Sequence, residues 1–135
     1  MLFTRECDYA IRILRALSGS EIVNVQDISK RENISIQMAY KLTRKLEKSG
    51  IIKSYRGVNG GYALKVSLKD LTLFELFTAL EQNFFMTECT NHSSVVCSQN
   101  TAEKPCMVHK EFCRLQEIMY NEMKRRSLLD IINGT

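Results

Sequence analysis

Residues 46–62 read LEKSGIIKSYRGVNGGY and carry the most specific structural signals of the chain. It contains a helix end at Gly50, a β-prone run over 51–56 and a glycine-rich turn over 57–61. A second β-prone run follows over 62–66, and Asn-Gly at 59–60 is a strong local signal for a hairpin. The stretch therefore predicts a helix followed by a two-stranded β-hairpin.

Two further helices are predicted ahead of this stretch. Thr4 is placed to cap a helix that runs to about Ser18, and a second helix is expected over 25–32. After a short break at 33–35, Ser35 caps the third helix, which ends at Gly50. Helix, short turn and capped helix form a helix-turn-helix, and the hairpin behind it makes the pattern that of a winged helix.

The second half of the chain predicts a connecting loop and a long helix. A capping box at 72–75 opens a fourth helix to about Glu81, and the helical period then disappears over 83–104. Pro105 is expected in the first turn of a helix to about Arg126, and Ser127 should cap a last helix over 128–132. An apolar stripe on the long helix requires a partner surface. The stripe consists of Phe112, Leu115, Met119 and Met123.

We therefore expect a mainly α protein with a small β-hairpin. Residues 1–82 should form a winged helix-turn-helix head for DNA binding, and residues 83–104 a cysteine-bearing loop. Residues 105–135 should form a dimerisation helix with a short C-terminal helix. No run of about 18 apolar residues occurs, so no membrane span is expected. The opening residues turn polar at once, so we expect no export signal and a cytoplasmic location.

Charge is distributed unevenly between the two halves. Residues 1–66 carry 12 Lys and Arg against 6 Asp and Glu, a net +6, whereas residues 67–135 carry 7 against 9, a net −2. A basic head points to an anionic partner, and double-stranded DNA suits a helix-turn-helix. Most of the candidate DNA contacts form one stripe on the third helix; Tyr40 flanks the stripe and Arg56 lies in the hairpin turn. Such a stripe is also compatible with an ordinary solvated helix face. The candidate contacts are Gln37, Tyr40, Lys41, Arg44, Lys48 and Arg56.

The chain contains five cysteines, and thiol or metal chemistry is favoured over disulfides. Cys89, Cys97, Cys106 and His109 follow the spacing Cys-x7-Cys-x8-Cys-x2-His. This spacing is too open for a zinc ribbon but is compatible with a loop around an iron–sulfur cluster. Cys7 lies on the apolar face of the first helix and is expected in the core. Cys113, one turn beyond His109, is a further candidate ligand, but its helical neighbours favour a packing role.

From these residues the chain resembles the winged-helix transcription regulators that include IscR, NsrR and RirA. The resemblance rests most on 46–62, with Asp8-Tyr9-Ala10, Ile34-Ser35 and the three loop cysteines, and it covers nearly the whole chain. It implies a homodimer paired through the long helix, and many such proteins bind a [2Fe-2S] or [4Fe-4S] cluster. It also implies Cys89, Cys97 and Cys106 as iron ligands.

Two residues are candidates for a fourth ligand, and the resemblance does not choose between them. Cys106-x2-His109 resembles the cysteine–histidine pair of IscR-type members, and Asp8 matches an aspartate that NsrR-type members supply from the partner subunit. Asp8 also has a structural explanation, because it can pair with Arg12 one turn later.

The expected function is a dimeric regulator whose operator binding is set by an iron–sulfur cluster. Two other functions stay open: a cluster-free regulator of the same family that senses a small molecule or a partner protein, as CymR-like members do, and a carrier of metal or clusters. We find no nucleophile–base constellation and no phosphate-binding loop, so the sequence does not indicate an enzyme.

Overall fold

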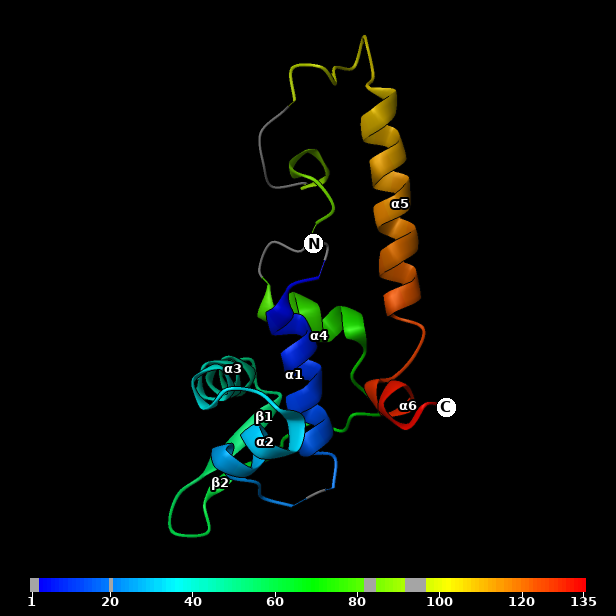
Figure 1. Ribbon diagram of the computed structural model, residues 1–135. Coiled ribbons are helices and arrows are strands. Elements are labelled where there is room, and N and C mark those ends of the chain that lie inside the picture. The colour runs from blue at the N-terminus through cyan, green and yellow to red at the C-terminus, as the bar shows by residue number, and fades with distance from the viewer. Residues whose placement is uncertain (1–2, 20, 82–84, 92–96) are drawn as a thin grey trace.

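The computed structural model describes residues 3–19, 21–81, 85–91 and 97–135. Six α-helices, one short 3-10 helix and one hairpin make up these residues (Figure 1). The predicted mainly α fold with a small β-hairpin is confirmed. In chain order the elements are α1 (Arg5–Ala16), α2 (Val25–Glu32), α3 (Ile36–Lys48), β1 (Ile52–Tyr55), β2 (Gly61–Leu64), α4 (Leu73–Leu80), η1 (Glu88–Thr90), α5 (Met107–Met123) and α6 (Leu128–Asn133).

The helix-turn-helix consists of α2 and α3, and local side chains set its ends. Asn24 caps α2 by accepting a hydrogen bond from the Asp27 amide at 2.8 Å, and Ser35 caps α3 by accepting one from the Met38 amide at 3.2 Å. Asn33 ends α2 with a φ of 52°, a left-handed conformation that asparagine tolerates better than most residues. The predicted break at 33–35 is confirmed.

The wing is a β-hairpin, and one further residue pairs with it in the manner of a third strand. β1 and β2 pair antiparallel from Ile52 opposite Leu64 to Tyr55 opposite Gly61. Val23 exchanges two backbone hydrogen bonds with Tyr62, each 2.9 Å long, so the segment before α2 extends the hairpin. The wing is thereby fixed to the helical head on one edge.

The turn of the wing lies in the predicted glycine-rich stretch, but it is not the two-residue turn that Asn-Gly favours. A two-residue turn of that kind needs positive φ at both central residues. Neither Asn59 nor Gly60 has a positive φ, whereas Gly57 has a φ of 106°. The loop is five residues long, and the Gly60 amide donates to the Gly57 carbonyl at 3.0 Å. The hairpin prediction was right, but the turn residue is Gly57.

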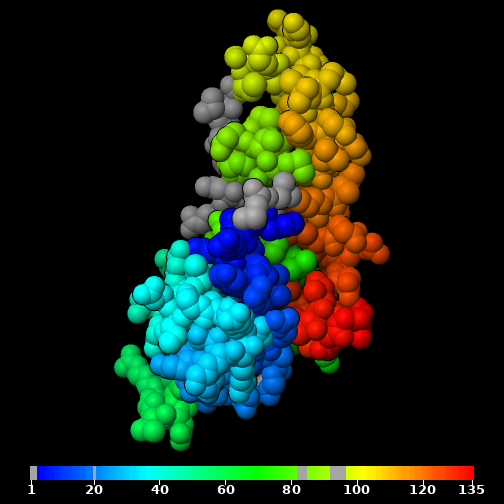
Figure 2. Space-filling view, in the orientation of Figure 1, coloured from blue at the N-terminus to red at the C-terminus, as the bar shows by residue number. Residues whose placement is uncertain are grey.

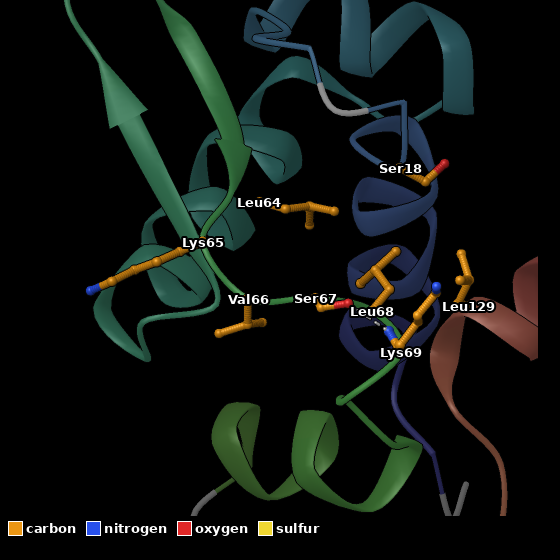
Figure 3. A pocket seen from close by; sticks show the side chains of 8 residues that line it. All are labelled: Ser18, Leu64, Lys65, Val66, Ser67, Leu68, Lys69 and Leu129. Carbon is orange, nitrogen blue, oxygen red and sulfur yellow. Dashed lines mark hydrogen bonds between the residues drawn. The ribbon is translucent and has the colours of Figure 1, made fainter.

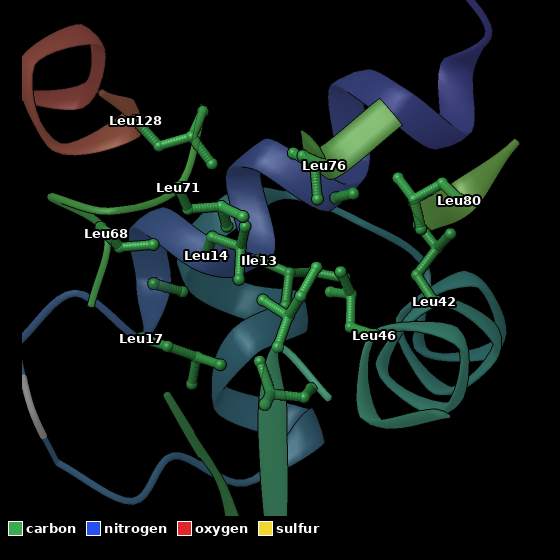
Figure 4. Close-up of a cluster of buried hydrophobic side chains, with 14 of the residues drawn as sticks. Ile13, Leu14, Leu17, Leu42, Leu46, Leu68, Leu71, Leu76, Leu80 and Leu128 are labelled. Atoms are coloured by element: carbon green, nitrogen blue, oxygen red, sulfur yellow. The ribbon is translucent and has the colours of Figure 1, made fainter. Parts of the chain in front are cut away.

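One hydrophobic core holds the head together (Figure 4). Ile13 and Leu14 of α1 and Leu17, its C-cap residue, lie at the centre of the core and are fully buried. Each buried aliphatic side chain of this size contributes about 1.5–3 kcal/mol through removal from water. Around them lie buried residues of α3, α4, α6 and the connection between β2 and α4. These are Leu42, Leu46, Leu68, Leu71, Leu76, Leu80 and Leu128.

Helix α6, which follows α5 in the chain, packs against this core. The Leu128 amide donates to the Leu71 carbonyl at 2.7 Å, and the Leu129 amide donates to the Leu68 carbonyl at 3.1 Å. Ser127 caps α6 by accepting from the Asp130 amide at 3.1 Å, as predicted. Residues at both ends of the chain therefore contribute to one core.

The start of α5 was predicted wrongly. Cys106 is the N-cap residue and α5 begins at Met107, so Pro105 precedes the helix instead of lying in its first turn. Thr4 is at the N-cap of α1, as predicted, but its side chain makes no capping bond and its hydroxyl donates to Glu81 at 3.2 Å. The predicted loop over 83–104 contains η1, and its residues 83–84 and 92–96 lie outside the described part of the chain.

The apolar stripe predicted for α5 divides between two faces. Met123 is buried and Met119 packs against the core of the same chain. The Tyr120 ring meets the Phe74 ring of α4 edge-on, with centroids 5.0 Å apart. A separate apolar face remains exposed, which consists of Met107, Val108, Leu115 and Ile118. Among the described helices, none is long and apolar enough to cross a lipid bilayer.

Candidate nucleic-acid interface and cysteine site

α3 presents the predicted polar stripe to solvent. Its buried residues are Ala39, Leu42, Thr43 and Leu46. All five candidate contacts on this helix are exposed, because they lie off that buried face. They are Gln37, Tyr40, Lys41, Arg44 and Lys48.

Glu6 of α1 neutralises part of this surface, which the sequence gave no reason to expect. Its carboxylate forms ion pairs with Lys41 and with Lys45, the latter at 2.5 Å. Hydrogen bonds from Lys41 and then Lys45 lower the pKa of Glu6. A glutamate in the first turn of a helix is normally explained by the helix dipole, and only the packing of α1 on α3 reveals this role.

Three basic candidates form no ion pair with any residue that the structure describes. The ion pairs found among the described residues include neither Arg44 nor Lys48 nor Arg56. Arg56 is exposed at the wing tip beside Val58, whose side chain is fully exposed. Figure 2 shows the wing projecting beyond the rest of the head. A projecting basic loop and a basic helix stripe are suited to a DNA groove and its phosphates.

Asp8 and Arg12 form the ion pair that their spacing predicted, at 2.9 Å. A second α1 residue, Arg15, joins α1 to α2 by a forked pair with Glu32. Arg15 Nε donates to Glu32 Oε1 at 3.1 Å and Nη2 donates to Oε2 at 2.5 Å. Glu32 is only 8% exposed, so the arginine compensates a buried carboxylate. The helix-turn-helix is therefore fixed to α1 by charge as well as by the core.

Cys89, Cys97 and Cys106 lie in or at the end of the connection between α4 and α5. Cys7 is buried in the core with 1% exposure, as predicted. Cys89 is in η1, and its sulfur lies 3.2 Å from the Thr87 hydroxyl. Cys97 and Cys106 are linked through Asn100, whose amide donates to the Cys97 carbonyl and whose side chain accepts from the Cys106 amide, each at 2.9 Å.

All five cysteines are free thiols, and Cys89, Cys97 and Cys106 are half-buried. His109 Nε2 lies 3.4 Å from the sulfur of Cys113, one turn further along α5. Within the described residues, no group of three or more Cys, His, Asp or Glu side chains is gathered to hold a metal ion. The structure therefore places the predicted ligands on neighbouring segments without bringing them together.

A buried polar contact that the sequence did not suggest joins the Cys89 segment to α5. Gln116 accepts hydrogen bonds from the Met86 amide and from the Thr90 hydroxyl, both at 2.7 Å. Gln116 and Thr90 are 6% and 1% exposed. A glutamine on an amphipathic helix normally faces water, so only the tertiary structure identifies it.

A surface pocket of about 420 Å³ lies between the end of α1, the segment after β2 and α6. Figure 3 shows Lys65 and Val66 pointing away from Ser18 and Leu129 on the other side of the pocket. Most of the lining is exposed, and Leu68 is its buried residue. An open pocket of this kind lacks the buried, convergent polar groups typical of a small-molecule site.

Comparison with known proteins identifies the chain's relatives. The sequence profile of the Rrf2 family, described as an iron-dependent transcriptional regulator, matches residues 3–134. Protein rrf2 of Nitratidesulfovibrio vulgaris is 30% identical over 142 residues, covering 98% of this chain and 87% of that protein. NsrR of Halalkalibacterium halodurans, an HTH-type transcriptional regulator, is 26% identical over 126 residues, covering 91% and 80%.

Protein aau3 of Rhizobium meliloti is 28% identical over 99 residues, which cover 72% of this chain and 64% of that longer relative. Two solved structures share the fold. CymR, described as the global cysteine regulator of B. subtilis, has a TM-score of 0.77 at 19% identity and covers 98% of this chain and 97% of its own. IscR of T. potens has a TM-score of 0.75 at 18% identity and covers 98% and 86%.

At such low identities the two structures demonstrate the winged-helix fold alone. The family profile covers nearly the whole chain, and relatives within it are named as transcriptional regulators. This protein therefore belongs to the Rrf2 family and is a DNA-binding transcriptional regulator, not an enzyme.

Proposed function

We propose that the chain is a homodimeric regulator whose binding to a DNA operator is controlled by an iron–sulfur cluster, [2Fe-2S] or [4Fe-4S]. Cys89, Cys97 and Cys106 would hold the cluster. The observation that carries the proposal is the state of these thiols. All three are free and half-buried; hydrogen bonds through Asn100 connect Cys97 with Cys106, and hydrogen bonds to Gln116 attach the Cys89 segment to α5.

The donor set suits this cofactor, because thiolates are the usual protein ligands of iron–sulfur clusters. The described residues do not form a gathered ligand group, so the segment carrying Cys89 must approach the segment 97–106 when the site assembles. A bound cluster would supply a covalent cross-link between these segments. The chain's own part is to hold Cys89 beside α5 and to hold Cys106 at the α5 N-terminus.

His109 and Asp8 remain the candidates for a fourth ligand. His109 lies on α5 three residues after Cys106, and its ring already contacts a sulfur atom, that of Cys113. The partner subunit's Asp8 would have to leave its ion pair with Arg12. We prefer His109, because it requires neither that loss nor a second chain.

The head over residues 1–82 would contact the operator, and residues 83–104 would connect it to the arm over 105–135. Gln37, Tyr40, Arg44 and Lys48 would enter or border the major groove, and Lys41 would join them once it releases Glu6. Arg56 would reach the adjacent minor groove from the wing. Binding to the bacterial chromosome would place the protein in the cytoplasm.

The exposed apolar face of α5 would pair two copies. Val108, Leu115 and Ile118 follow spacings of 7 and 3, which place them along one side of the helix. A two-fold axis brings such a face against its own copy and removes it from water. This face, and not Met119 or Met123, is therefore the proposed dimer contact.

A second candidate is a cluster-free regulator of the same family that senses a small molecule or a partner protein. The absence of a gathered ligand group among the residues that the structure describes favours it. Reconstitution decides between the two functions, because only the first one requires iron and sulfide.

The test is anaerobic reconstitution with iron and sulfide, followed by visible absorption and metal analysis. We expect wild type to bind both elements, and Cys89→Ala, Cys97→Ala and Cys106→Ala each to lose the absorption. Cys7→Ala is the matched control and should retain it, because this thiol is buried in the core of the head. Comparison of His109→Ala with Asp8→Ala identifies the fourth ligand. A wild-type protein that binds neither element would overturn the cluster and support the second candidate.

A further inference from the structure

Gln116 is the best-connected buried polar side chain of the arm. Its Oε1 accepts from the Met86 amide and the Thr90 hydroxyl at 2.7 Å, and its Nε2 donates to the Thr90 carbonyl at 3.4 Å. Among the described residues, its partners all belong to 86–90, the segment that carries Cys89. One α5 side chain therefore determines where this segment lies.

The contact is specific because every polar atom within it has a partner. A buried amide is costly unless its hydrogen bonds are satisfied, and no described buried side-chain polar atom lacks a partner. The Thr90 hydroxyl also lies 2.8 Å from the Thr87 carbonyl oxygen, so its single proton is shared between that oxygen and Gln116 Oε1, and the Thr87 hydroxyl contacts the Cys89 sulfur at 3.2 Å. A chain of polar contacts thus runs from Gln116 to the thiol.

The same contact supports α5. Helix α5 packs against α4 near its C-terminal end and against η1 further up, as Figure 1 shows. Of the exposed apolar residues, Leu115 directly precedes Gln116 and Ile118 follows it two residues later, on the same turn of the helix. A change in how the Cys89 segment is held will therefore act on the part of α5 that presents its apolar face.

We propose that Gln116 and Thr90 are positioning residues that couple the Cys89 thiol to α5. In this arrangement the segment 86–90 and the apolar face of α5 adopt their positions together. A chemical event at Cys89 then changes the geometry of the arm. The regulatory consequence rests on the proposed function, whereas the coupling itself is a property of the protein without any cofactor.

The first experiment measures the rate at which N-ethylmaleimide alkylates Cys89 in the cofactor-free protein, by peptide mass spectrometry. Gln116→Leu removes the polar contacts at similar volume and should raise the rate about tenfold, because loss of buried hydrogen bonds favours local opening. Glu117→Gln is the matched control, since it changes an exposed neighbour on α5, and should leave the rate unchanged. Cys7, in the head core, is the internal reference. A Cys89 rate in Gln116→Leu equal to wild type overturns the proposal.

A second pair of variants tests the same contact from the other side, so that the result does not depend on whether Gln116→Leu folds correctly. Thr90→Val keeps the shape and removes the hydroxyl, whereas Thr90→Ser keeps the hydroxyl that donates to Gln116. We expect Thr90→Val to raise the Cys89 rate and Thr90→Ser to retain the wild-type rate. Equal rates for the two variants would show that the hydroxyl does not position the segment, and would overturn the proposal.

The regulatory consequence is measured separately, as the ratio of operator affinities with and without reconstituted cluster. Gln116→Leu should reduce this ratio towards one, while Glu117→Gln should keep the wild-type ratio. If wild type binds no cluster, the proposed function fails and the alkylation result still decides the coupling. If wild type binds the cluster and Gln116→Leu keeps the full ratio, the coupling has no regulatory role and that part is overturned.

Discussion

At the scale of single residues, Gly60 and Gly61 are required by close contacts of the backbone. A Cβ on Gly61 would lie 2.4 Å from the Val23 carbonyl oxygen, and one on Gly60 would lie 2.4 Å from the Tyr55 carbonyl oxygen. Both contacts are with backbone atoms that cannot rotate away. Any side chain at position 61 must therefore displace the strand contact that attaches the wing to the head.

We predict that Gly61→Ala lowers the free energy of unfolding by about 1–3 kcal/mol, the usual cost of overpacking. It should also weaken operator binding, since the wing loses its support at Val23. Urea unfolding and gel-shift titration measure the two effects. Gly19→Ala is the control, because a Cβ there meets nothing within 4 Å. Equal stability of Gly61→Ala and wild type would contradict the close approach.

At the scale of elements, Glu6 connects α1 with the recognition helix α3. It holds Lys41 and Lys45 in the absence of DNA, so the helix presents less positive charge than its sequence carries. Phosphates compete for the same lysines. If α3 contacts DNA as proposed, Glu6 reduces general attraction to DNA while Arg44 and Lys48 remain available.

We predict that Glu6→Gln raises affinity for non-specific duplex DNA by about threefold at low salt and steepens its salt dependence, as expected for freed lysines. Fluorescence anisotropy over a range of salt concentrations measures both. Glu122→Gln is the control, because it makes the same charge change on α5 beside Arg125. If the two variants bind alike, the effect reflects net charge and not the contact with α3.

The ion pairs of Glu6 with Lys41 and Lys45 also predict how the stability of the protein depends on pH. The lysines lower the pKa of Glu6 below its usual value of 4.5. The ionised carboxylate therefore stabilises the folded state above that value, and this stabilisation is lost as pH falls through the lower folded pKa. Unfolding free energies of wild type and Glu6→Gln, measured between about pH 7 and pH 3, should converge in acid. A difference that grows on acidification would contradict this assignment.

At the scale of the whole molecule, the DNA-binding and cysteine-bearing parts lie at opposite ends. Figures 1 and 2 show the wing at one end and the segment around residue 100 with the start of α5 at the other. α5 and α6 connect the two ends, and α6 joins the core of the head through Leu128. A signal at the cysteines can therefore reach the head through α5, which also presents the proposed dimer face.

We predict that Leu115→Asp and Ile118→Asp each convert a dimer into monomers, because a buried carboxylate on both sides of a two-fold axis is unfavourable. Sedimentation at micromolar concentration measures the assembly, and operator affinity should fall with it. Asn121→Asp, on an exposed position of the same helix, should leave the dimer intact. A wild-type monomer, or dimers in both variants, would exclude this face as the contact.

The sequence by itself determined the local elements. Ser35, the Thr72–Glu75 box and Ser127 set helix starts through bonds to residues three positions away, and Gly50 and Asn33 set helix ends through their own φ angles. Such features depend on neighbours in the chain, so their residue types are informative. Burial of Cys7 was predictable for the same reason, because it shares a helical face with other apolar residues.

Three features depend on how the elements pack together: which face of α5 stays exposed, which lysines pair with Glu6, and which segment Gln116 holds. In each case the partner is distant in sequence: Lys41 and Lys45 for Glu6, and residues 86–90 for Gln116. A glutamate or glutamine on a helix has the same local pattern whether it faces water or a neighbouring element. The physical difference is the loss of water around the side chain, and that loss arises only when the elements pack together.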